Sequence, residues 1–158
     1  MFASLVADAG AVNELKHSRA PTPVEHQPVI RMNRDTLYGS AVVDISRGAG
    51  VTIPDSGDRY VSVMVVNQDH YVNRVFHEPG DHELTVEEFD TQWVAVAARI
   101  LVDSANGDDV AAVSEVQDEL EVRANSSKQF EMGSGRSPST TPTATSSGTT
   151  ATPTASTT

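Results

Sequence analysis

Apolar and polar residues alternate with a period of two along most of the chain between residues 29 and 102. This period predicts β-strands rather than helices. The predicted strands cover residues 36–45, 51–53, 59–67, 71–76, 83–85 and 93–102. Turn-forming runs such as Asp55-Ser56-Gly57-Asp58 separate them. The last strand is apolar nearly throughout, which predicts burial on both of its faces.

Helical spacing occurs on both sides of this strand-rich region. Phe2, Leu5 and Val6 predict one or two short helical turns within residues 2–16, and Val12 and Leu15 continue the apolar spacing after Gly10. Residues 20–28 contain three prolines and predict an extended loop.

A second helix is predicted after the last strand. Ser104 or Asn106 can cap its first turn, where Asp108 and Asp109 favour the helix dipole. An apolar face with helical spacing runs to about residue 123 and consists of Val110, Val113, Val116 and Leu120. About six short strands with no helix between them favour an antiparallel sandwich or barrel, with this helix across the sheet or over an edge.

Composition changes abruptly at residue 133. All 22 acidic residues lie before it, and residues 133–158 are mostly Ser, Thr and Pro with Arg136 as their single charged residue. Such a segment cannot bury enough apolar area to become ordered, so we expect one β domain over residues 1–132 and a disordered tail. Consecutive Asp codons read one base later become Thr codons, so an Asp-rich continuation would appear as a Thr-rich segment. We therefore expect the tail to be translated from a shifted reading frame. Under this hypothesis the domain is truncated.

The net charge of −11 at pH 7 argues against nucleic acid or an anionic membrane as a partner. The chain has no cysteine, which excludes disulfides and thiolate chemistry. No apolar run reaches the ~20 residues of a membrane span, and no secretory signal is apparent at the N-terminus, so we expect a cytoplasmic location.

Several motifs occur in a characteristic order. Asn33-Arg34-Asp35-Thr36-Leu37-Tyr38 is followed by Val43-Asp44-Ile45, then by Asp58-Arg59-Tyr60 and Val66-Asn67-Gln68-Asp69. Over about residues 2–132 this series resembles the family called domain of unknown function 1254. The resemblance implies an immunoglobulin-like β-sandwich, in which a second β domain often follows. That second domain is expected to be missing from this chain.

The motif around Asn33 supplies the first candidate ligand-binding residues, which are Asn33, Asp35, Thr36 and Tyr38. They could form a polar cluster at a strand mouth that holds a small molecule. The alternative is a turn, in which Asn and Asp side chains bond nearby backbone N–H groups and Tyr38 joins the core. We expect the structural role.

Arg59, Asp69 and His70 complete the candidate set. Arg59 could pair with Asp35, Asp44 or Asp69, or could bind a ligand carboxylate. Asp69 and His70 are a possible general-base pair, although neighbouring strand residues point to opposite faces.

Metal and cofactor chemistry find little support. His70, His77 and His82 lie near three acidic residues, but no spacing matches a known metal-ligand motif, and we expect no metal. No nucleophile elbow or glycine-rich phosphate loop occurs, and no cofactor is expected.

The function therefore stays open from sequence alone. We expect a non-enzymatic module that binds a small molecule or another domain. One alternative is a hydrolase that gathers Asp35, Tyr38, Arg59, Asp69 and His70 at one end of the sandwich. The other is an inactive truncated fragment.

Overall fold

The computed structural model describes residues 1–23, 25, 33–126, 128 and 130. The expected disordered tail and the proposed frame shift lie outside the described residues. The elements follow one another as α1 (Phe2–Ala9), β1 (Lys16–His17), β2 (Thr36–Asp44), β3 (Ala49–Ile53), β4 (Val61–Asn67), β5 (Val72–Phe76), β6 (Gly80–Leu84), α2 (Val86–Phe89), β7 (Trp93–Leu101), α3 (Gly107–Glu119) and β8 (Glu121–Ala124).

The strands form two antiparallel sheets, which we call the large and the small sheet. The large sheet has the strand order β1-β2-β7-β4-β5, and the small sheet has the order β6-β3-β8. The longest ladder of the large sheet joins β2 to β7 over nine residue pairs, from Thr36 opposite Leu101 to Asp44 opposite Trp93. The prediction of a mainly antiparallel β fold is confirmed, whereas an immunoglobulin-like topology stays a prediction.

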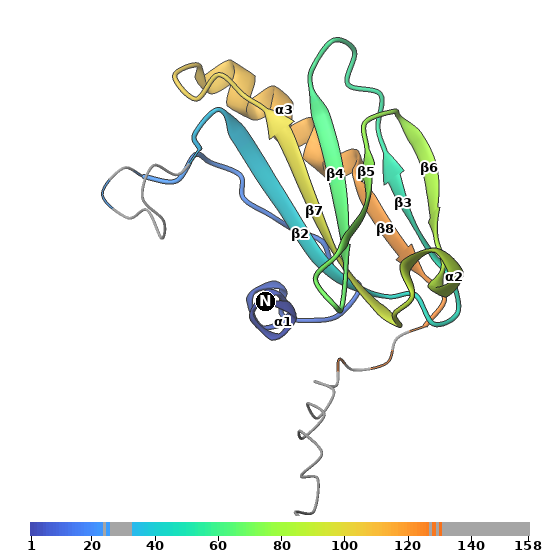
Figure 1. The fold of residues 1–158 in the computed structure, drawn as a ribbon. Coiled ribbons are helices and arrows are strands. Elements are labelled where there is room, and N and C mark those ends of the chain that lie inside the picture. The colour runs from blue at the N-terminus through green and yellow to red at the C-terminus, as the bar shows by residue number, and fades with distance from the viewer. Residues whose placement is uncertain (24, 26–32, 127, 129, 131–158) are drawn as a thin grey trace, which may run out of the picture.

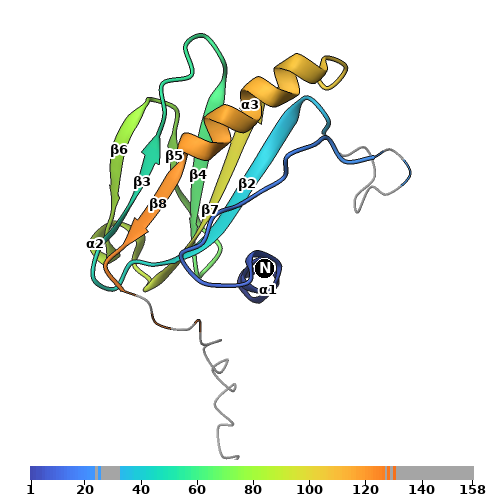
Figure 2. The ribbon, with the colours of Figure 1, turned by 180° about the vertical axis from the view of Figure 1, so that it is seen from behind.

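The core lies between the two sheets. Alternate residues of β2, β7 and β4 point inward, and they meet β3, β6 and α3 in one buried cluster. Figures 1 and 2 show α3 and the small sheet side by side on one face of the large sheet, with α1 on the opposite face. We call these the inner and the outer face of the large sheet.

The N-terminal helix ends earlier than the apolar spacing predicts. Gly10 takes a left-handed conformation with φ of 90°, and its N–H donates to the Val6 carbonyl, which closes α1. Val12 and Leu15 therefore do not continue the helix. Lys16 and His17 instead pair with Ser40 and Gly39 at the edge of the large sheet.

The second helix is also shorter than predicted. It begins after the Asn106 cap, as expected, but it ends at Glu119 rather than near residue 123. Leu120 is extended and buried in the core, so the chain leaves the helix there and forms β8 along β3. Strand β8 and the short helix α2 were not predicted. Strand β6 begins at Gly80, three residues before the predicted strand at residues 83–85.

The expectation for the last strand holds along part of β7. Its first four residues are buried, but Arg99 and Leu101 are exposed on the outer face. No helix in the described part of the chain is both long and apolar enough to cross a membrane.

Candidate functional site

The predicted site residues lie at both ends of the large sheet. Thr36 pairs with Leu101, and Val61, which follows Arg59 closely, pairs with Ile100. Asn67, which precedes Asp69 and His70, pairs with Val94 at the other end. Six residues along β7 correspond to roughly 20 Å. The fold therefore does not gather these residues at one end of the sandwich.

The Asn33 motif fixes the entry into β2. The Asp35 N–H donates to Asn33 Oδ1 over 3.0 Å, and the Asp35 carbonyl accepts from the Val102 N–H at 2.8 Å. These bonds are the turn chemistry of Asx residues. The Thr36 side chain is buried, and the half-buried Tyr38 ring lies 5.7 Å from the Arg99 guanidinium carbon. The motif geometry supports the structural role, but the expectation that Tyr38 joins the core was wrong, because Tyr38 lies on the outer face of the large sheet.

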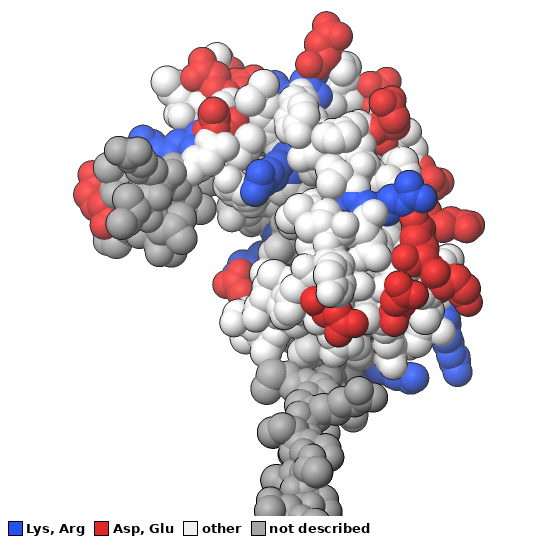
Figure 3. All heavy atoms as spheres, in the orientation of Figure 1, with Lys and Arg blue, Asp and Glu red and all other residues white. Residues whose placement is uncertain are grey.

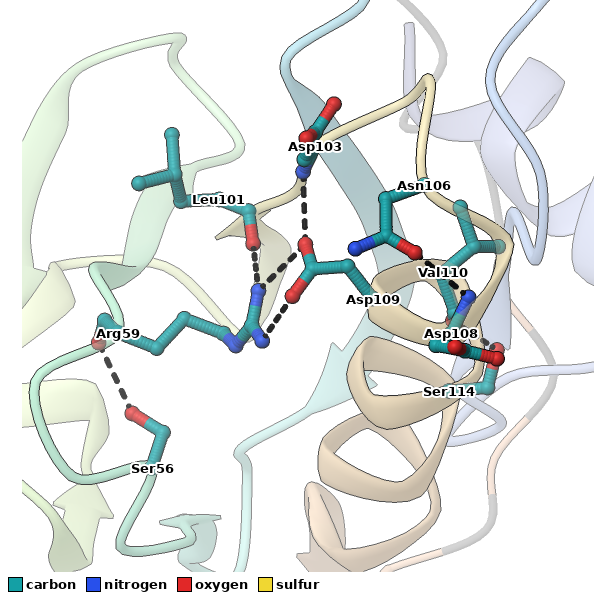
Figure 4. A network of polar contacts seen from close by, with 9 residues as sticks. All are labelled: Ser56, Arg59, Leu101, Asp103, Asn106, Asp108, Asp109, Val110 and Ser114. Carbon is teal, nitrogen blue, oxygen red and sulfur yellow. Dashed lines mark hydrogen bonds and ion pairs between the residues drawn. The ribbon is translucent and has the colours of Figure 1, made fainter.

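Arg59 forms an ion pair with Asp109 of α3, shown in Figure 4. The three partners expected from sequence, Asp35, Asp44 and Asp69, were wrong. The guanidinium donates to both carboxylate oxygens of Asp109, over 2.6 and 3.1 Å, and to the Leu101 carbonyl over 2.7 Å. Such a bidentate pair fixes the relative position of two planar groups. It ties the loop before β4 to the first turn of α3.

This ion pair lines an open hollow of about 560 Å³ at the end of β7. The hydrogen bonds from Arg59 and from the Asp103 N–H lower the pKa of Asp109 to about 2. A carboxylate of that pKa is a weak general base near neutral pH. The Asp109 hydrogen bond also raises the pKa of Arg59. The hollow therefore presents two ions that already satisfy each other.

Asp69 and His70 form the turn between β4 and β5. The N–H groups of Asp69 and Tyr71 both donate to Asn67 Oδ1, and His70 takes a left-handed φ of 69°. The His70 ring meets Phe2 of α1 edge-on, with 6.1 Å between ring centres. Within the described residues, no hydrogen bond joins the Asp69 and His70 side chains, so the geometry supplies no general-base pair.

A buried carboxylate that the sequence did not single out as a site is Asp44. It accepts from Ser126 Oγ at 2.5 Å, from the Ser46 N–H at 3.0 Å and from Gln92 at 3.4 Å. Burial opposes ionisation, but these donors outweigh it and lower the pKa of Asp44. A charged residue in an apolar strand was the available signal. The network anchors the segment after β8 to the end of β2.

The histidines near the β5–β6 turn have separate partners. His77 lies beside the Val61 carbonyl, and His82 stacks on Phe76 with 4.3 Å between ring centres. Among the residues that the structure describes, no three His, Cys, Asp or Glu side chains lie together as metal ligands would.

The outer face of the large sheet divides into a covered and an uncovered part. Phe2 of α1 packs on Val42, Val66, Trp93 and Ala95. The remaining outward residues include the polar Thr36, Ser40 and Ser62 and a set of larger, partly or fully exposed side chains, which we call the apolar face. Its members are Tyr38, Met64, Val72, Val75, Ala97, Arg99 and Leu101.

The apolar face is exposed and carries little charge. Val72 is 55% exposed, and Val75 and Leu101 are each 45% exposed. Arg99 is the single charged member of the face, although the chain has 22 acidic residues. Figure 3 shows this side of the molecule as a largely uncharged centre, with acidic side chains along its right-hand border. Contiguous exposed apolar residues with a polar rim mark interaction sites.

Comparison with known families finds a match over part of the chain. The family model of DUF1254, described as a protein of unknown function, matches residues 12–83. The resemblance seen in the motifs is thus confirmed over this stretch, which contains the Asn33 motif, Arg59 and the β4–β5 turn. No curated protein matches the chain.

A solved structure supports the fold. The crystal structure of the VPA0106 protein from Vibrio parahaemolyticus matches with a TM-score of 0.54 at 19% sequence identity. The match covers 64% of this chain and 32% of the VPA0106 protein, so the chain spans about one third of that protein's length. At this identity the similarity concerns the fold alone.

Proposed function

We propose that this DUF1254 domain is a non-enzymatic module that docks another protein domain on its apolar face. The observation that carries the proposal is the exposed set of Val72, Val75 and Leu101 on one sheet face, which has Arg99 as its charged member in a strongly acidic chain. About half of the surface of each of these side chains stays in contact with solvent in the fold. Covered by a partner, they would contribute roughly 25 cal/mol per Å² of buried apolar area.

The nature of the partner follows from the same face. Arg99 makes no ion pair with any described residue and lies between Tyr38 of β2 and Ser62 of β4, so it suits a carboxylate on the partner. A second copy of this chain would bring two such arginines together. The VPA0106 protein is about three times longer than its matched part, which supports a second domain as the occupant.

The enzyme alternative has weaker support. Its five residues lie at opposite ends of the large sheet, and the hollow beside Arg59 contains an ion pair that is already satisfied. Small-molecule sites are concave, whereas the apolar face is a row of exposed side chains on a sheet. The cytoplasmic location stays a prediction, as does the absence of a nucleic-acid partner.

Site-specific photo-crosslinking in the native host tests this function. A benzoylphenylalanine at position 38 or 101 should give the same adduct, identified by mass spectrometry as one protein or domain. Purified unlabelled chain should compete with it, and Arg99→Glu should remove it. The matched control carries the probe at Glu121, on the outer face of the small sheet. No adduct, or an equal adduct from the control position, contradicts the proposal.

A further inference from the structure

Strand β5 is an open edge of the large sheet. It pairs with β4 on one side, and no strand of the described chain pairs with its other side. A free edge exposes backbone N–H and C=O groups that can pair with a further strand. Folded proteins protect such edges with charged residues, with proline or with very short strands.

The other sheet edges of the described chain carry this protection. Strand β1 has two residues, one of which is Lys16. The edges of the small sheet present Asp81 and Glu83 on β6 and Glu121 and Arg123 on β8. Strand β5 differs, because its outward positions hold the exposed Val72 and Val75. Its charged residue, Arg74, is bound to Glu88 of α2, and its local protection is the bulge at Asn73.

We infer that β5 accepts an extended segment of a partner protein in which apolar and basic residues alternate. This inference rests on the proposed function, since it describes how a partner bound to the apolar face would extend onto the edge of β5. On the outer face, the segment's apolar side chains would continue the row that Met64 and Val75 begin. The alternate side chains would point towards the inner side.

The charge of the segment follows from the acids around β5. Glu88 is already paired with Arg74, but Glu78, two residues after β5, makes no ion pair with a described residue. Asp81 and Glu83 flank His82, which stacks on Phe76 of β5, and of these two acids Asp81 is paired with Arg123 whereas Glu83 makes no ion pair with a described residue. Figure 3 shows acidic side chains along this border. Basic side chains on the inner side would therefore be attracted, and a second copy of this acidic edge would be repelled.

Synthetic peptides test the inference on the full chain. The probes are a capped nine-residue peptide of alternating Lys and Val, the same peptide with Glu for Lys, and the Lys–Val peptide with N-methylated alternate amides. Amide NMR shifts should localise the first peptide to residues 72–76. It should bind at least tenfold more tightly than either of the others, because they lack the charge or the backbone donors.

Matched variants complete the test. Val75→Lys should weaken binding of the Lys–Val peptide at least fivefold, whereas Ala111→Lys, an equal charge change on exposed α3, should leave it unchanged. Amide spectra of both variants verify that they fold. Equal binding of all three peptides, shifts centred on the small sheet, or no binding overturns the inference. A specific crosslink at position 38 together with any of these results leaves the proposed function standing.

Discussion

The two sheets expose outer faces of opposite character. The small sheet presents Thr52, Asp81, Glu83, Glu121 and Arg123. Three of these bond to one another, because Asp81 accepts from Thr52 at 2.6 Å and from Arg123 at 2.5 Å. The large sheet presents the apolar face. Both sheets alternate inward and outward residues with the same period, so the backbone does not cause the difference.

The contrast separates what the fold needs from what it does not use. A sandwich needs apolar residues on its inner faces, and polar outward residues keep it monomeric. The small sheet follows this rule. The outer face of the large sheet departs from this rule, because its outward residues are largely apolar. Helix α1 covers one part of them, and no described residue covers the other part. Its aliphatic residues therefore indicate a contact outside the domain.

The largest predicted effect compares two valines of the same outer face. Val42→Asp places a charge beneath α1 with no partner, and should lower the free energy of unfolding by more than about 3 kcal/mol. Val75→Asp should change it by less than about 0.5 kcal/mol, because Val75 is exposed. Urea denaturation measures both. A large loss from Val75→Asp would mean that the apolar face is packed in the free protein.

The next effect concerns an acid that the fold uses. The pKa of Asp109 falls from 3.8 to about 2 on folding, mainly through Arg59. Its stabilisation is therefore present above pH 3.8 and is lost as the pH falls towards 2. Asp109→Asn should flatten the decline in melting temperature between pH 4 and 2. Asp81→Asn on the exposed small sheet should flatten it less, and the reverse order would contradict the assignment.

A smaller effect concerns the protected edge at β1. Burial, followed by the charge of Arg19, lowers the pKa of His17 from 6.5, while Asp118 opposes the shift. As the pH falls, His17 is therefore protonated in the unfolded chain before it is protonated in the folded protein. Stability should fall as the pH drops through 6.5. His17→Asn should remove this step. Melting curves between pH 7.5 and 5.5 measure it, and an unchanged step would assign it to another group.

The smallest effect concerns the cation of the apolar face. Arg99→Ala removes a contact with the Tyr38 ring and should cost about 0.5–1 kcal/mol of stability, the range for an exposed cation–π pair. Arg99→Lys should retain part of it. Because Arg99 is proposed to serve the partner, Arg99→Ala should weaken crosslinking far more than it weakens folding. A loss of stability equal to that of Val42→Asp would assign Arg99 to the fold.

The strands were predictable because their period survives in the sequence. β2, β4, β5 and β7 begin and end within two residues of the predicted bounds. The two helices were located by their apolar spacing and by the Asn106 cap. Strand β8 was missed because Leu120 fits the helical spacing equally well, and only the unpaired edge of β3 determines that the chain extends there.

The site was less predictable, because its contacts join distant residues. The turn chemistry of Asn33 is local and could be foreseen. Arg59 and Asp109 are 50 residues apart, and nothing in their neighbourhoods identifies the pair. The apolar face depends on which outward residues α1 covers, a packing fact that the alternation of residues does not contain.

The long ladder between β2 and β7 also affects how the protein is made. β2 is synthesised early, and its main partner β7 follows only after β3–β6. At translation rates of about 5–20 residues per second, β2 waits roughly 3–11 s for that partner. During this interval the valines of β2 cannot be buried in the large sheet, and pairing of such distant segments is intrinsically slow. A nascent chain stalled before residue 101 therefore offers chaperones a bare nine-residue strand.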